Sequence, residues 1–178
     1  LEKAGSGGEG GDVIVGSNDK YNHGIDVFNV TVYGDKSRPS WVDYLNSTGD
    51  SYTGIGQNGE LDVINITSNN VSSSVTSSFP STSTWASLTI GATNDNLTLI
   101  DAHTFKGDLT LGNLEEVRNL ATLEATGGGN VKFYGEVDQP GAFRYTTGAG
   151  NDLVDVDVDG NALKNSTSGL LIETGAGK

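Results

Sequence analysis

Gly7-Gly8-Glu9-Gly10-Gly11-Asp12-Val13-Ile14-Val15 fits the nonapeptide pattern G-G-x-G-x-D-x-U-x at every fixed position. The glycines permit a sharp turn, because they have no Cβ to clash in the backbone conformations that such a turn requires. The Asp12 carboxylate and the exposed carbonyl groups of the turn are hard oxygen donors, which Ca²⁺ prefers. The apolar position points a strand residue inward. The stretch therefore predicts a cation-binding turn that leads directly into a β-strand.

Further copies of this pattern follow along the chain. Residues 147–154, Thr-Gly-Ala-Gly-Asn-Asp-Leu-Val, change only the first glycine and place Asp152 where the first copy has Asp12. Weaker copies, which keep the Asp-x-apolar ending, contain Asp26, Asp62 and Asp95. A plain β-turn, in which Asp or Asn bonds its own backbone, is the alternative interpretation of each copy. Residues 174–178 repeat the opening of the copy at Asp152, which we interpret as a fragment of a longer repetitive protein.

Short segments rich in β-branched and aromatic residues, bounded by Gly, Asn and Asp, fill the rest of the chain. They span residues 12–15, 25–33, 61–67, 88–90, 97–100, 109–111, 131–134 and 153–158. In the second half, strand-like segments begin at intervals of 9 to 12 residues. We therefore predict an all-β fold, a right-handed parallel β-helix or β-roll-like solenoid with irregular loops. A β-sandwich is the alternative.

The two halves of the chain differ in regularity. Residues 34–59 are expected to form a long loop anchored by Trp41, Tyr44 and Leu45. The Ser- and Thr-rich stretch 68–84 resembles a linker. We therefore divide the chain into residues 1–84, an irregular β region, and residues 85–178, a regular solenoid region, which together can form one continuous domain. Residues 114–123 are compatible with one or two helical turns or with a strand and a bend.

A second acidic feature lies in residues 152–159. Strand alternation places Val154, Val156 and Val158 on the buried face and Asp155, Asp157 and Asp159 on the opposite face. Like charges about 7 Å apart on one face repel each other, so this ridge is either a cation site or a solvated strand face.

The charge and composition exclude several classes of partner. The formal net charge is -13, which disfavours nucleic acid and anionic membranes. No stretch approaches the roughly 18 consecutive apolar residues of a membrane-spanning helix. The chain has no Cys, which suits a cytosolic protein or a bacterial surface protein stabilised by metal.

Catalytic motifs are not apparent in the sequence. The chain has two histidines, His23 and His103, and neither belongs to an H-E-x-x-H motif. There is no G-x-S-x-G elbow, and His103 is interpreted as a turn residue. We therefore predict that the protein is not an enzyme.

Residues 7–15 and 147–154 resemble the repeats of RTX-type calcium-binding bacterial surface proteins, which include S-layer proteins and giant repeat adhesins exported by type I secretion. The resemblance implies folding outside the cell, where calcium is near millimolar. It also implies calcium binding through turn carbonyls and Asp side chains. On this chain those positions are Gly8, Gly10, Asp12, Gly148, Gly150 and Asp152.

Two functions remain open. The first is a structural or adhesive calcium-stabilised module of a secreted cell-surface protein, whose partners are calcium ions and other copies or neighbouring repeats of the same protein. The second is a calcium-binding accessory module of a secreted polysaccharide-active enzyme, whose partner is a polysaccharide. A catalytic domain in the same gene product, or an oligosaccharide-binding screen, would separate the two.

Overall fold

The structure, a computed structural model, describes residues 10–16, 24–36, 39–48, 61–69, 85–165 and 167–176, and all regular elements in these ranges are β-strands. In chain order they are β1 (Gly11–Gly16), β2 (Val27–Tyr33), β3 (Ser40–Thr48), β4 (Val63–Asn69), β5 (Leu88–Thr93), β6 (Leu99–Asp101), β7 (Leu109–Leu111), β8 (Val117–Arg118), β9 (Thr122–Ala125), β10 (Val131–Val137), β11 (Ala142–Thr147), β12 (Leu153–Val158) and β13 (Gly169–Thr174). The described residues contain no helix with the length and apolarity to cross a membrane.

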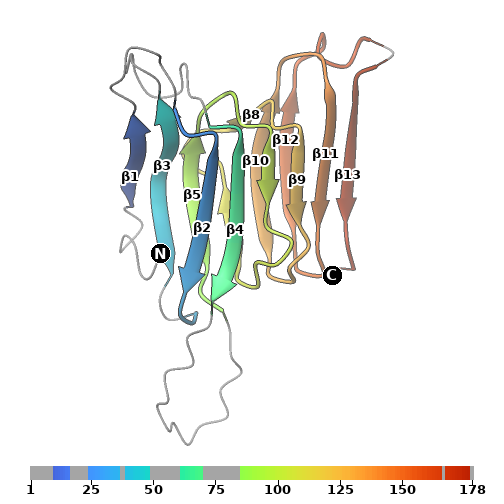
Figure 1. The fold of residues 1–178 in the computed structure, drawn as a ribbon. Coiled ribbons are helices and arrows are strands. Elements are labelled where there is room, and N and C mark those ends of the chain that lie inside the picture. Colours follow the sequence, from blue (N-terminus) through green and yellow to red (C-terminus); the bar gives the residue numbers. More distant parts are fainter. Residues whose placement is uncertain are drawn as a thin grey trace, which may run out of the picture.

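The strands form two sheets between which the chain alternates. The first sheet has the order β1-β3-β5-β7-β10-β12, with β8 beside β10, and the second has the order β13-β11-β9-β6-β4-β2. All pairings between these strands are parallel. The strands of the two sheets run in opposite directions, so the chain rises through one sheet and descends through the other (Figure 1). We call one strand of the first sheet with the following strand of the second sheet a circuit.

The length of a circuit changes along the chain. Asn29 and Asn65, which are partners between β2 and β4, lie 36 residues apart. Val131 and Asp152, at the starts of β10 and β12, lie only 21 residues apart. The longer circuits of the first half therefore carry extra residues between their strands, whereas the later circuits are short.

Inward-facing side chains stack on one another from circuit to circuit. In the second sheet Ile64, Ile100, Leu123 and Tyr145 are in register on successive strands, and each is fully buried. The Tyr145 ring meets Phe133 of the first sheet edge to face, with ring centroids 4.8 Å apart, and its hydroxyl donates to the Leu120 carbonyl over 2.9 Å. Burial raises the pKa of Tyr145 well above its ordinary value. Fully burying one such apolar side chain contributes about 1.5–3 kcal/mol, so these columns hold the sheets together.

Two expectations for the less regular segments are settled by the structure. The predicted loop at residues 34–59 is wrong in its middle, because β3 occupies Ser40–Thr48 and pairs with β1 and β5. Residues 114–123 form bends followed by β8 and the start of β9, so the strand-and-bend alternative is correct.

Hydrogen-bonded ladders cross the predicted boundary near residue 85. β3 pairs with β5, and β4 pairs with β6, so each sheet continues from the first half into the second. Residues 70–84, the predicted linker, lie outside the described residues. The division at residue 85 stays a prediction about independent folding.

Candidate metal-binding turns

The predicted ligands lie on two opposite edges of the molecule. Gly10, Asp12, Gly148, Gly150 and Asp152 lie at or beside the starts of strands of the first sheet, where the chain arrives from the second sheet. We call this the glycine edge, because its turns contain Gly107 and residues 127–129 and 148–150. Gly8 lies outside the described residues.

The weaker copies of the pattern lie at the opposite edge of the sheets. We call it the asparagine edge, because Asn94 and Asn119 lie in its turns. Asp26 and Asp62 precede β2 and β4 there, and Asp95 follows β5. The sequence pattern therefore does not correspond to one row of equivalent sites.

Turns at the glycine edge pack backbone against backbone. A Cβ atom built on Gly129 would lie 1.9 Å from the Gly107 carbonyl oxygen, and one built on Gly150 would lie 2.4 Å from the Gly129 carbonyl oxygen. Both distances are far below a van der Waals contact, so a side chain cannot be accommodated without moving the turns apart. Close stacking of successive turns explains glycine at 129 and 150 whether or not a cation is bound.

Asp and Asn side chains join these turns across circuits. Asp108 Oδ1 accepts a hydrogen bond from the Asn130 amide over 2.9 Å, and Asn130 Oδ1 accepts one from the Asn151 amide over 2.8 Å. Asp152 Oδ1 accepts from the Val131 amide over 2.9 Å. Each bond joins residues 21 or 22 positions apart, so the side chains link neighbouring circuits.

Asp152 has a second hydrogen bond within its own turn. The Thr147 hydroxyl donates to Asp152 Oδ2 over 2.6 Å. Each carboxylate oxygen thus has one protein donor, and each keeps a lone pair, because a carboxylate accepts about four hydrogen bonds. Asp152 can therefore ligate a cation while it holds the turn, with Asn side chains and turn carbonyls as further hard oxygen donors.

Sequence reasoning missed Asp108 and Asn130 in this group. A signal for Asn130 was present, because Thr126-Gly-Gly-Gly-Asn130 precedes Thr147-Gly-Ala-Gly-Asn151 at the circuit interval of 21 residues. The triplet of glycines without a following Asp concealed the repeat.

The first motif is also tied to its neighbouring circuit. The Gly10 amide donates to Asp43 Oδ1 of β3 over 3.0 Å, across 33 residues of sequence. Asp12 is exposed on β1. The Asp43 carboxylate, which the sequence pattern does not mark, is therefore a further oxygen donor beside the first motif.

Asp26 and Asp62 lie next to each other on successive circuits. The amides of Asp62 and Val63 both donate to the Asp26 carbonyl over 2.9 Å, and the Thr98 amide donates to the Asp62 carbonyl over 2.8 Å. Both Asp side chains are exposed. On the next circuit the equivalent position is Thr98, which has no carboxylate. Only two circuits therefore place an Asp at this position.

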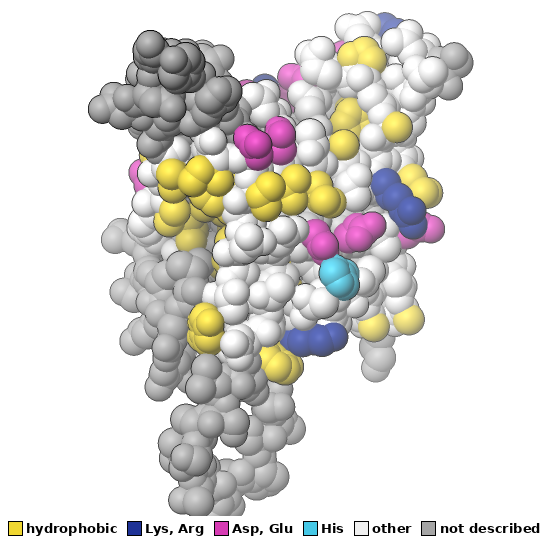
Figure 2. Space-filling view, viewed as in Figure 1, with side chains coloured by type: hydrophobic (Ala, Val, Ile, Leu, Met, Phe, Trp, Pro, Cys, Tyr) yellow, Lys and Arg dark blue, Asp and Glu magenta, His cyan; other side chains and the backbone are white. Residues whose placement is uncertain are grey.

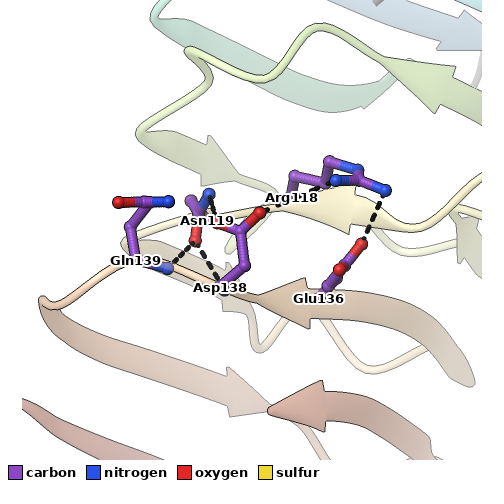
Figure 3. A network of polar contacts seen from close by, with 5 residues as sticks. All are labelled: Arg118, Asn119, Glu136, Asp138 and Gln139. Atoms are coloured by element: carbon purple, nitrogen blue, oxygen red, sulfur yellow. Dashed lines mark hydrogen bonds and ion pairs between the residues drawn. The ribbon is translucent and has the colours of Figure 1, made fainter. Parts of the chain in front are cut away.

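The sequence did not predict the polar network that Arg118, Asn119, Glu136, Asp138 and Gln139 form (Figure 3). Asp95 interacts electrostatically with Arg118 and Asp138 of this network. Arg118 Nη2 is 2.9 Å from Glu136 Oε2, and Arg118 Nη1 is 3.6 Å from Asp138 Oδ2. Partial burial raises the pKa of Asp95; the Arg118 charge opposes this increase and the Asp138 charge adds to it. The Arg118 guanidinium therefore already offsets part of the negative charge here, which makes this the weakest of the predicted cation positions.

Asp155 and Asp157 lie exposed on the outer face of β12, while Val154 and Val156 pack against the core. Asp157 is in register with Glu136 on β10, so two carboxylates meet on adjacent strands. Across the described residues, however, no three His, Cys, Asp or Glu side chains gather closely enough to hold a metal ion. A cation bound here would depend on backbone and amide oxygens as well as carboxylates.

His103 lies in a turn after β6, on the side of the second sheet (Figure 2). Its Nδ1 is 2.5 Å from Asp101 Oδ1, and its amide also donates to that oxygen over 3.1 Å. Partial burial raises the pKa of Asp101, but the hydrogen bonds and charge of His103 outweigh this and lower it overall. The pair is exposed, which is typical of a turn held by a side chain.

Comparison with protein-family models, curated proteins and solved structures finds no match to this chain.

Proposed function

We propose that this chain is a right-handed parallel β-helix that serves as a structural or adhesive module of a secreted bacterial cell-surface protein. The observation that carries the proposal is the alternation of the chain between two all-parallel sheets, with circuits stacked in register. Each circuit buries its apolar residues within itself, as Phe133 and Tyr145 do, and against the neighbouring circuits, which is how repetitive solenoids build long rigid bodies.

The pairing of the strands favours a solenoid over a β-sandwich. Sandwich sheets are antiparallel, whereas the strands that follow one another across each described sheet pair in parallel and belong to successive circuits. Right-handedness follows from the general rule that a crossover between parallel strands of one sheet is right-handed in about 98% of cases.

Calcium is the cofactor that we propose. The chain has a net charge of -13, and self-repulsion of that size disfavours a compact state unless cations neutralise it. Asp152 and Asp12, with the turn carbonyls of Gly148, Gly150 and Gly10, are the proposed ligands at the glycine edge. Asp26, Asp62, Asp155 and Asp157 are proposed to hold cations more weakly on the exposed surface.

An extracellular location fits the same chemistry. Calcium is near millimolar outside cells, so a module stabilised by weak surface sites folds there and stays unfolded before export. The protein acts without catalysis in this proposal, through rigidity and through contacts with neighbouring repeats or other copies of itself.

The experiment that tests the proposal is a thermal melt of the full chain in excess chelator and again with several millimolar calcium restored. We expect calcium to raise the melting temperature by about 2–4 °C for each kcal/mol by which calcium binding stabilises the folded chain, the range for a protein of this size. An unchanged melting temperature would refute the calcium proposal.

Variants assign the effect to the turns. Asp152→Ala and Asp12→Ala should each reduce the calcium-dependent shift. Asp152→Ala also lowers stability without calcium, because it removes the bonds from Val131 and Thr147, so the quantity compared is the shift and not the absolute melting temperature. Glu115→Gln, an exposed acid outside every copy of the pattern, is the matched control and should keep the full shift.

A further inference from the structure

A cavity of about 220 Å³ lies between the two sheets in the first circuits. Val42, Leu88 and Ile90 of the first sheet, all almost fully buried, form one wall. Phe28 and Val30 of β2 form the opposite wall and are only partly buried against the core.

The cavity coincides with an irregularity in strand pairing. The register between β1 and β3 shifts by one residue between Gly11 and Val13, so the first circuit does not repeat the side-chain positions of the next. In a later circuit, by contrast, the space lined by Phe105, Leu109 and Val131 is closed to a water-sized molecule. The later circuit around Phe105 therefore fills its interior, whereas the irregular first circuit leaves room.

The lining determines what can occupy this room. Asn29 and Thr31 border the cavity, but their side chains bond Asn65 and Thr67 on the exposed face, with Asn65 Nδ2 2.9 Å from Asn29 Oδ1. The other lining residues are apolar. A buried water needs two to four polar partners, whereas a dry cavity of about 150 Å³ lined by Leu, Ile and Phe holds benzene.

We propose that this cavity binds an uncharged apolar molecule of the size of a small aromatic ring or a short alkyl chain. Val13 lines the cavity and is 39% exposed, so access from solvent lies beside β1. The ligand is a free hydrophobic molecule or the end of a lipid acyl chain, since both present the same chemistry to these walls. This binding needs neither calcium nor a surface-protein role.

Toluene titration of the full chain, followed by methyl NMR, tests the proposal. Saturable shifts are expected at the methyl groups of Val13, Val30, Val42 and Leu88, together with a rise in melting temperature. If toluene produces no saturable shifts at these methyl groups, the proposal that the cavity binds an apolar molecule is wrong.

Two variants locate the site. Val42→Phe fills the cavity from its buried wall, and Val13→Phe narrows its exposed side, where a larger residue does not threaten folding. Each should weaken toluene binding by about tenfold or more, which is about 1.4 kcal/mol. Leu114→Phe, at a position 60% exposed away from the cavity, should bind within about twofold of the original chain. Equal binding by all three variants would place toluene elsewhere and refute the proposal.

Two further titrations identify the source of the ligand. Octanol in solution represents a free alkyl molecule, and vesicles of zwitterionic phosphatidylcholine represent acyl chains in a bilayer. Octanol shifts at the cavity methyl groups without vesicle binding indicate a free molecule. Vesicle binding that Val42→Phe abolishes indicates an acyl chain, and failure of both titrations counts against the proposal.

Discussion

Gly129 lies in the turn before β10, where the backbones of two circuits almost touch. An added Cβ would lie 1.9 Å from the Gly107 carbonyl oxygen, and backbone cannot move aside as the end of a flexible side chain can. We predict that Gly129→Ala lowers the free energy of unfolding by roughly 1–3 kcal/mol or more, the usual cost of overpacking. Denaturant unfolding followed by circular dichroism measures the change.

Gly160→Ala is the control for this substitution. No atom lies within 4 Å of a Cβ placed on Gly160, so the free energy of unfolding should change by no more than about 0.5 kcal/mol. Equal stabilities of the two variants would mean that the turns at the glycine edge are not closely stacked.

Asn119 is a non-glycine residue with a positive φ, 50°, between β8 and β9. Its Oδ1 accepts hydrogen bonds from the amides of Asp138 and Gln139 over 3.0 and 3.1 Å, and its Nδ2 donates to Asp138 Oδ1 over 2.6 Å (Figure 3). Asn tolerates the left-handed conformation better than most residues. Asn119 can therefore adopt the positive φ and also make the hydrogen bonds to Asp138 and Gln139.

Two substitutions at Asn119 separate the contribution of its hydrogen bonds from the contribution of its backbone conformation. Asn119→Gly keeps the backbone conformation but loses the hydrogen bonds, at a cost of roughly 1–3 kcal/mol. Asn119→Ala loses the bonds and adds strain of about 1–2 kcal/mol, so it should be the less stable of the two. Chemical denaturation ranks them, and an Ala variant as stable as the Gly variant would contradict the assignment of strain to this residue.

In the candidate metal turns, the local sequence pattern predicted the position of a turn but not its hydrogen-bond partners. The sequence located the turn at Asp152 and its glycines, because the pattern is local. It could not reveal that Asp152 bonds the Val131 amide, since that partner lies 21 residues away and is defined only by stacking of the circuits. Asp108 and Arg118 were missed for the same reason: their partners belong to neighbouring circuits.

At the scale of elements, alternation located most strands correctly. Residues 153–158 were predicted as a strand with Val154, Val156 and Val158 facing inward, and β12 has these bounds. Val154 and Val156 pack against the core, but the prediction was wrong for Val158, which ends the strand and is 39% exposed. Alternation succeeds there because one face of the strand contacts the core and the other contacts solvent.

β3 escaped prediction because its burial does not alternate. Tyr44, Leu45, Asn46 and Ser47 are all buried in succession, so the polar residues among them look like a loop in the sequence. Pro39 immediately before the strand strengthens that impression, although proline is acceptable ahead of a strand. The sequence also did not reveal which strands pair in the first half. The intervals from β2 to β4 and from β4 to β6 are much longer than those between the paired strands of the later circuits, so no single repeat length connects them.

At the scale of the whole molecule, the stack of circuits presents two different ends. The outer strands at one end are β12 and β13, and no described strand covers them. Ile172 of β13 is in register with Tyr145, which is fully buried, yet Ile172 itself is 41% exposed. The row of inward-facing side chains thus continues to a surface that contacts solvent, together with the open edges of two sheets.

Such an end favours association, because apolar side chains and open strand edges are both covered when another circuit packs on them. The acidic surface opposes it, since a net charge of -13 makes two copies repel each other. We predict that the protein associates as its concentration rises, and that salt or calcium strengthens the association by screening this repulsion. Sedimentation velocity over a range of concentrations measures both effects.

Ile172→Lys places a charge on the inward row at the open end and should abolish the association, because an uncompensated charge would have to be buried in the contact. Leu114→Lys makes the same change on an exposed bend between β7 and β8 and should leave the association intact. The prediction is wrong if Ile172→Lys associates as strongly as the original chain, or if the original chain remains monomeric at high concentration with calcium present. Head-to-tail packing of unlike ends is not self-limiting, so the expected products are a series of growing oligomers and not a closed dimer.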